Sequence, residues 1–242
     1  MPGIITGLEE NYYAILSKDE EGSILYDVPE RLYDIQQIQV SPEVQSMDVP
    51  GDNRTVETIT QCLGAGVTVQ WAKQKSSERA IFLGEKVLSN GIKAAGETDD
   101  PPYVAIGYKR TMTGGVTRYV WLLKTKFGHT QETADTKPVG SIQPQYPTIS
   151  GKAITRNADG QWKFQIDSND PDYTEALGAN WFTKATLETL ANVASTTYGK
   201  PAKVEFVTTL PATGIAGVVY IDTDAEPISA HYWDGSAFVA IE

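Results

Sequence analysis

The sequence contains few of the residues on which catalysis and metal binding most often depend. There is one cysteine, Cys62, and there are two histidines among the 242 residues. One cysteine cannot form a disulfide within the chain, and no cysteine–histidine cluster has the spacing of a metal site. Cys62 stands between Ile59 and Leu63 in a strand-like segment, which predicts a buried and unreactive thiol. Phosphate-binding loops, zinc-protease motifs and nucleophile elbows are also missing, so we expect no enzymatic activity, no cofactor and no metal.

Positive charge and long apolar runs are scarce as well. The chain has 20 Lys and Arg against 31 Asp and Glu, which gives a formal net charge of −11. Because nucleic-acid binders neutralise phosphates with basic side chains, tight DNA binding is not expected, but a surface that DNA passes without adhering would suit this balance. No apolar run approaches the ~18 residues of a membrane helix, and residues 1–5 lack signal-peptide features. We expect no membrane contact and a cytoplasmic location in the producing cell.

What the sequence does contain is a series of β-type segments. Short runs rich in Val, Ile, Thr, Tyr and Trp predict strands at 12–16, 32–40, 56–63, 66–71, 103–108 and 117–127. Some of these carry Gln, Thr or Glu on their second face, which is typical of a sheet wetted on one side. Gly114 and Gly115 predict a tight hairpin between the last two strands. The fold class is therefore mainly β.

A polar segment separates two of these strands. Pro50 and Gly51 interrupt hydrogen-bonded ladders, and Asp52 and Asn53 favour turn geometry. The pattern predicts a long loop between two antiparallel strands. Its residues are Ser46, Met47, Asp48, Val49, Pro50, Gly51, Asp52, Asn53 and Arg54.

Helical signals are few. The segment 76–83 begins with a capping serine, Ser76, and is followed by Gly84, which predicts a short helix. In 184–195 the apolar residues share one helical face, and Thr183 would cap it. One or two short α-helices are expected beside the strands.

Two other sets of side chains suggest binding surfaces. The tryptophans are Trp71, Trp121, Trp162, Trp181 and Trp233. They could form a carbohydrate-binding face, but their apolar neighbours favour core or interface positions. Lys124 and Lys126 would share one face of a strand, where an exposed basic face could meet an acidic partner.

A boundary near Tyr198 separates a domain of residues 1–198 from a small module of residues 199–242. The module carries strand-like runs at 204–207, 218–222, 231–233 and 237–241. They predict a three- or four-stranded β-meander. Such a small sheet is marginally stable by itself, so we expect it to pack against the main domain or against a neighbouring subunit.

Five sequence blocks follow one another in the first domain: 7–16, 83–92, 102–108, 118–127 and 146–151. In their order and spacing they resemble the phi13-type family of major tail proteins, from long-tailed phages of low-GC Gram-positive bacteria. Glu85, where that family often has His, and the stretch 143–145 depart from the pattern. In the module, 209–222 and 232–239 resemble a small accessory module that is appended to several virion proteins.

The resemblance implies a structural virion protein with a β-sandwich or rolled-barrel fold. Such subunits form hexameric rings that stack into a tail tube, and their inner strands close into one barrel through which DNA passes without specific binding. Expected partners are further copies of the chain, the tape measure and the terminator, and the expected location is the virion tail, after assembly in the host cytoplasm.

Within that picture, the loop 46–54 would contact the next ring, and strands from about 32–45 and 55–71 would face the lumen. The candidate lumenal residues are Gln37, Gln39, Glu43 and Glu57. Two alternatives are a tail-terminator or baseplate ring protein of the same fold and a host-carbohydrate-binding virion module. An enzyme acting on cell wall is a third, disfavoured because no catalytic motif is found.

Overall fold

The computed structural model of the protein describes residues 3–21, 23–51, 54–136, 140, 144–190, 203–212, 218–222, 229–233 and 238–241. The chain divides into two compact units, Met1–Ala191 and Asn192–Glu242. The boundary that the sequence predicts near residue 198 lies outside the described residues.

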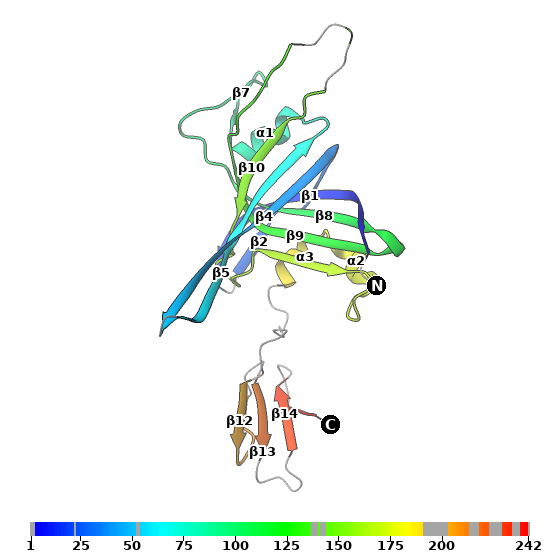
Figure 1. The fold of residues 1–242 in the computed structure, drawn as a ribbon. Helices are drawn as coiled ribbons and strands as arrows, with labels where there is room; N and C mark the ends of the chain where they lie inside the picture. The colour runs from blue at the N-terminus through cyan, green and yellow to red at the C-terminus, as the bar shows by residue number, and fades with distance from the viewer. Residues whose placement is uncertain are drawn as a thin grey trace. The chain divides into compact units, whose positions relative to one another are not determined.

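The first unit is built mainly from β-strands, with three short helices (Figure 1). The strands are β1 (Ile5–Glu20), β2 (Ser23–Tyr26), β3 (Glu30–Leu32), β4 (Ile35–Gly51), β5 (Arg54–Trp71), β6 (Lys86–Val87), β7 (Lys93–Ala94), β8 (Tyr103–Met112), β9 (Thr117–Gly128), β10 (Thr148–Ala153) and β11 (Lys163–Asp167). The helices are α1 (Ser76–Leu83), α2 (Glu175–Asn180) and α3 (Lys184–Thr189). Each predicted strand overlaps an observed one, but 56–63 and 66–71 form a single strand, and 32–40 is interrupted at Asp34, whose φ is 58°.

Nine of these strands form one antiparallel sheet in the order β2-β1-β8-β9-β10-β5-β4, with β11 added on β9 and β3 on β1. The short strand β10 pairs with both β9 and β5. Figure 1 shows β5 and β10 running steeply across β8 and β9. The sheet therefore folds over at β10 into two layers, and the predicted mainly β sandwich with few helices is confirmed. Gly114 and Gly115 turn the β8–β9 hairpin at φ of 81° and 74°, as predicted.

The main hydrophobic core lies between the two layers. Its buried members include Ile38, Val67, Val69 and Trp71 from one layer and Val104, Ile106, Val120 and Leu122 from the other. Helix α1 closes this core with Phe82 and Leu83 and ends at Gly84, which has a φ of 67° that glycine adopts without strain. The helix prediction for 76–83 is confirmed. The predicted capping residue is wrong: Lys75, and not Ser76, occupies the N-cap position, and its side chain makes no capping hydrogen bond.

A second core covers the opposite face of β8 and β9. Trp121 and Leu123 of β9 pack there with Trp181 and Leu187 from the region of α2 and α3. The indole Nε1 of Trp121 donates to the backbone oxygen of Trp181 at 2.8 Å, which satisfies a buried donor. Thr183 accepts a hydrogen bond from the Thr186 amide at the start of α3, as predicted, but residues 191–195 lie outside the described part of the chain. Helix α2 was not predicted.

A buried ion pair fastens the end of β1 to β9. Lys124 Nζ lies 2.6 Å from a carboxylate oxygen of Asp19, and each side chain is less than a tenth exposed. Burial raises the pKa of Asp19, but hydrogen bonds from the Asn157 amide, from Lys124 and from the Ala158 amide outweigh it, so that the pKa lies below its ordinary value. The expectation that Lys124 belongs to an exposed basic face is therefore wrong, because a carboxylate inside the subunit already pairs with it.

The second unit contains four described strands: β12 (Lys203–Val207), β13 (Val218–Asp222), β14 (Ser229–Trp233) and β15 (Phe238–Ile241). They pair in chain order, and the pairs β13–β14 and β14–β15 are antiparallel. The first pair, β12 and β13, is parallel. The predicted three- or four-stranded meander is therefore confirmed for β13, β14 and β15, while β12 does not belong to it, since parallel neighbours need a crossover instead of a hairpin.

Candidate assembly surfaces

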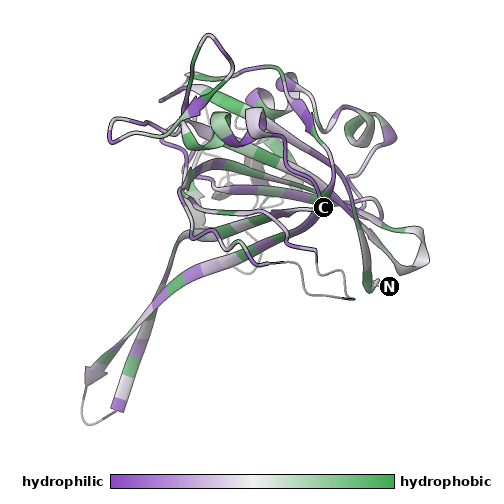
Figure 2. Ribbon diagram, turned by 90° about the horizontal axis from the view of Figure 1, so that it is seen from above, coloured by the Kyte–Doolittle hydropathy of each residue, from purple (hydrophilic) through white to green (hydrophobic). Residues whose placement is uncertain are grey.

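Strands β4 and β5 form a two-stranded ribbon whose outer half leaves the body of the first unit (Figures 1 and 2). We call residues 44–51 and 54–62 the arm. The predicted loop 46–54 is wrong for most of its length, because 46–51 belong to β4 and Arg54 begins β5; Asp52 and Asn53 lie outside the described residues. Pro50 is tolerated because β4 is the edge strand of the sheet, where one missing amide donor breaks no ladder.

The arm begins at an irregularity in β5. Pro42 pairs with Ala65, whereas Val44 already pairs with Cys62, so β5 contains one residue more than β4 in this interval. Gly64 lies in this bulge with a φ of 121°, and a Cβ there would overlap the carbonyl oxygen of Ala153. The bulge therefore requires glycine, and it marks the point where the ribbon leaves β10 and continues alone.

The two faces of the arm carry different pairs of side chains, and Val44, 56% exposed, lies on the face of Ser46. On one face, hydroxyl groups link the strands: Ser46 and Thr60 are 3.2 Å apart, and Thr58 donates to Asp48 at 2.6 Å. On the other face, Met47 and Ile59 stand directly opposite each other and are 63% and 50% exposed. This apolar pair has no covering layer in the described part of the chain. Exposed apolar side chains on a regular strand pair are typical of surfaces that become buried in an assembly.

Cys62 lies where the arm joins the body. Its side chain is exposed, and its Sγ is 3.6 Å from the backbone oxygen of Gly64. The predicted buried thiol is therefore wrong. The strand-like composition around Cys62 was interpreted correctly, but β5 enters the core only from Gly64 onward.

On the body, the outward face of β4 and β5 is polar. Gln37 and Gln39 are exposed, whereas Ile38 between them is buried in the core. The neighbouring positions on β5 and β10 carry Thr68, Gln70 and Ser150, and the Thr68 and Ser150 hydroxyls are 3.1 Å apart. This polar face agrees with the alternation in the sequence.

The four candidate lumenal residues lie on the same side of the ribbon but in different surroundings. Counting along β4, Glu43 falls on the side of Gln37 and Gln39, and Glu57, opposite Val49, falls on that side of the arm. The Glu43 carboxylate is 2.5 Å from Lys152 Nζ of β10, so its charge is compensated. The structure thus brings Gln37, Gln39 and Glu43 together on the body and places Glu57 on the arm.

The basic and aromatic candidates occupy separate positions. Lys126 is partly exposed and pairs with Asp100 at 2.7 Å, and both Lys124 and Lys126 lie over the Tyr103 ring. The two lysines therefore do share a side of β9, as predicted. Trp71, Trp121 and Trp181 are at most 2% exposed, so they cannot belong to a carbohydrate-binding platform.

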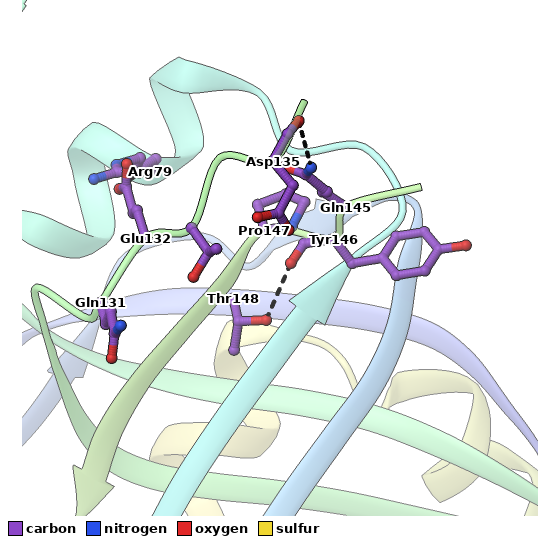
Figure 3. A pocket seen from close by; sticks show the side chains of 9 residues that line it. Arg79, Gln131, Glu132, Asp135, Gln145, Tyr146, Pro147 and Thr148 are labelled. Atoms are coloured by element: carbon purple, nitrogen blue, oxygen red, sulfur yellow. Dashed lines mark hydrogen bonds and ion pairs between the residues drawn. The ribbon is translucent and has the colours of Figure 1, made fainter. Parts of the chain in front are cut away.

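A surface hollow of about 470 Å³ lies beside α1 (Figure 3). Several of its polar side chains already have partners: Arg79 pairs with Glu132, and Gln145 Nε2 donates to the backbone oxygen of Asp135 at 3.0 Å. Thr148 at its floor donates to the backbone oxygen of Tyr146 at 3.3 Å. We see no paired nucleophile and base among the residues that line it.

Within the described ranges, no three Asp, Glu, His or Cys side chains come close enough to share a metal ion. The helices of the same part of the chain are all too short or too polar to cross a membrane. Comparison of the chain with models of known protein families and with curated proteins finds no match.

Proposed function

We propose that the chain is a structural subunit of a phage tail tube, which forms six-membered rings that stack through the arm. The observation that carries this proposal is the arm itself, a regular strand pair that extends beyond the body with an uncovered apolar pair, Met47 and Ile59. The five sequence blocks that resemble major tail proteins give the proposal its specific form.

The energetics of the arm favour assembly over a role in the isolated subunit. An isolated two-stranded ribbon is at best marginally stable in water. Burial of apolar surface contributes about 25 cal/mol per Å², so covering Met47 and Ile59 in every copy of a ring would stabilise a stack considerably. Strand edges that are left open also tend to pair with other chains, and β4 is such an edge.

The polar face of the body suits a lumen. Gln37 and Gln39 present uncharged amides, and Glu43 on the same side of β4 is paired with Lys152. Uncharged amides and a paired lysine attract phosphates only weakly. From the sequence, acidic strands were expected to repel DNA from the lumen. The proposal now depends more on the weak attraction between DNA and this surface.

The test is a trimmed subunit without the arm. Gln45 and Gln61 stand directly opposite each other, so residues 46–60 can be replaced by Asn-Gly, a two-residue turn that fits a hairpin at this position. We expect the trimmed protein to fold, with an unchanged melting temperature, and to form no tubes in negative-stain electron micrographs. Wild-type protein at the same concentration should form hollow tubes.

Tubes from the trimmed protein would refute the role of the arm. The two alternative functions give other results with the wild type. A terminator or baseplate protein would form single rings that do not elongate, and a carbohydrate-binding module would stay monomeric and bind glycans.

A further inference from the structure

We propose that the arm of one copy docks on the β6–β7 hairpin of a second copy, in a head-to-tail contact between successive rings. This inference rests on the proposed function and deepens it by naming the receiving surface. It starts from a second uncovered apolar group on the first unit. Val87, Leu88 and Ile92 are 58%, 46% and 55% exposed within one short hairpin.

The hairpin is an ordered structure that can receive a partner. Val87 pairs with Lys93 across it, and the Leu88 amide donates to the Ile92 oxygen at 2.8 Å. Its apolar side chains therefore project from a fixed backbone. Leu88 and Ile92 stand opposite each other and share the face of Lys86, whereas Val87 lies on the other face. An exposed apolar pair on one face of a hairpin differs from the single exposed apolar residues of an ordinary surface.

The two patches are complementary in charge. Residues 86–94 contain two lysines, Lys86 and Lys93, and no acidic residue. On the arm, the acidic Glu57 pairs with Val49, two positions from Met47, so it shares the face of Met47 and Ile59. An apolar centre with an acidic border would thus meet an apolar centre with a basic border. Such an arrangement favours the correct register and disfavours the pairing of two arms with each other.

The positions of the two patches fit stacking. In Figure 1 the arm leaves the lower end of the body, whereas the hairpin lies beside α1 at the upper end. An arm cannot reach the hairpin of its own subunit across the body. Two different patches at opposite ends give a heterologous contact, and repeating such a contact produces a filament instead of a closed pair.

The main experiment uses two variants that each lose one half of the contact, Ile59→Asp on the arm and Leu88→Asp on the hairpin. Both positions are exposed, so both variants should keep the wild-type melting temperature. We expect neither variant to form tubes alone, as judged by negative-stain microscopy. A mixture of the two ring preparations should give stacks of two rings, because only one of the two possible interfaces remains intact.

Normal tubes from Leu88→Asp would overturn the proposed docking while leaving the tail-tube function in place. Wild-type protein that forms no tubes would refute the function and the docking together, so the two failures are distinguishable. Charge reversal gives an independent check. Glu57→Lys should raise the concentration needed for tube formation at least tenfold, and adding Lys86→Glu and Lys93→Glu to the same chain should reverse most of that increase.

Cross-linking tests the contact in assembled tubes. In a Cys62→Ser background, Ile59→Cys combined with Leu88→Cys should give a ladder of disulfide-linked subunits on non-reducing gels after mild oxidation. The chain with Ile59→Cys alone should give none. Dimers from Ile59→Cys alone would show that arms meet arms, which would contradict the proposal.

Discussion

The inner and outer halves of the β4–β5 ribbon consist of the same two strands in different environments. In the inner half, Ile38 and Val67 alternate with Gln37 and Thr68, and each apolar residue is buried in the main core. In the outer half, the exposed Met47 falls on the side of Gln37, and no layer of the described chain covers it. The inner half is stabilised by the burial of its apolar side chains within the subunit. The other half keeps strand geometry without a covering layer, and under the proposed function a second copy would supply that layer.

The comparison predicts that equivalent truncations in the two halves have very different effects. Trp71→Ala removes a fully buried side chain and should lower the free energy of unfolding by about 3–5 kcal/mol. Ile59→Ala, in the same strand, should change it by less than about 0.5 kcal/mol. Denaturant titration of the monomer measures both. A large loss from Ile59→Ala would mean that the arm packs within its own subunit.

The body also contains a buried ion pair, which has no counterpart on the arm. Asp19→Asn leaves the Lys124 ammonium buried without its carboxylate and should cost about 3–5 kcal/mol at neutral pH. Because the folded pKa of Asp19 lies below its ordinary value, its contribution is present above about pH 4 and is lost as the pH falls through the folded pKa.

Unfolding measured from pH 7 down to pH 2 should therefore show the difference between wild type and Asp19→Asn shrinking toward acid. Asp48→Asn on the exposed arm is the matched control, with an effect within about 0.5 kcal/mol over the range. A constant difference for Asp19→Asn would show that the pair contributes nothing through its charge.

The bulge between the halves should be sensitive to one methyl group. Gly64→Ala places a side chain at a φ of 121° and against the Ala153 backbone, so a loss of about 2–3 kcal/mol is expected. Gly114→Ala also has a positive φ but meets no atom within 4 Å, and about 1 kcal/mol is expected there. Equal melting temperatures for the two variants would mean that the bulge relaxes freely.

The smallest effect concerns the hydroxyl face of the arm. Thr58→Val removes the hydrogen bond to Asp48 on an exposed surface and should cost no more than about 0.5 kcal/mol in the monomer. Amide hydrogen exchange should nevertheless become faster at residues 57–59 than in wild type. An unchanged exchange rate would indicate that the backbone ladder alone holds the arm.

The sequence predicted much of the body because its signals there are local. Alternation identified the strands, Gly114 and Gly115 identified their hairpin, and Gly84 identified the end of α1. The arm was interpreted as a loop because Pro50 and Gly51 interrupt strands in most contexts; the sequence does not show that β4 is an edge strand, which tolerates them.

Other errors arose from long-range pairing. Lys124 looked available because its partner Asp19 is far away in the sequence, and Cys62 looked buried because the exit of β5 from the core depends on the packing of β10 against Gly64. The hairpin 86–94 was not predicted as an interaction surface, since the sequence does not show that its apolar side chains are exposed.

The most direct test of the proposed function is negative-stain microscopy of concentrated wild-type protein, followed by averaging of end views. We predict long hollow tubes with sixfold symmetry. Particles that stay monomeric at every concentration, with no rings and no tubes, would contradict it.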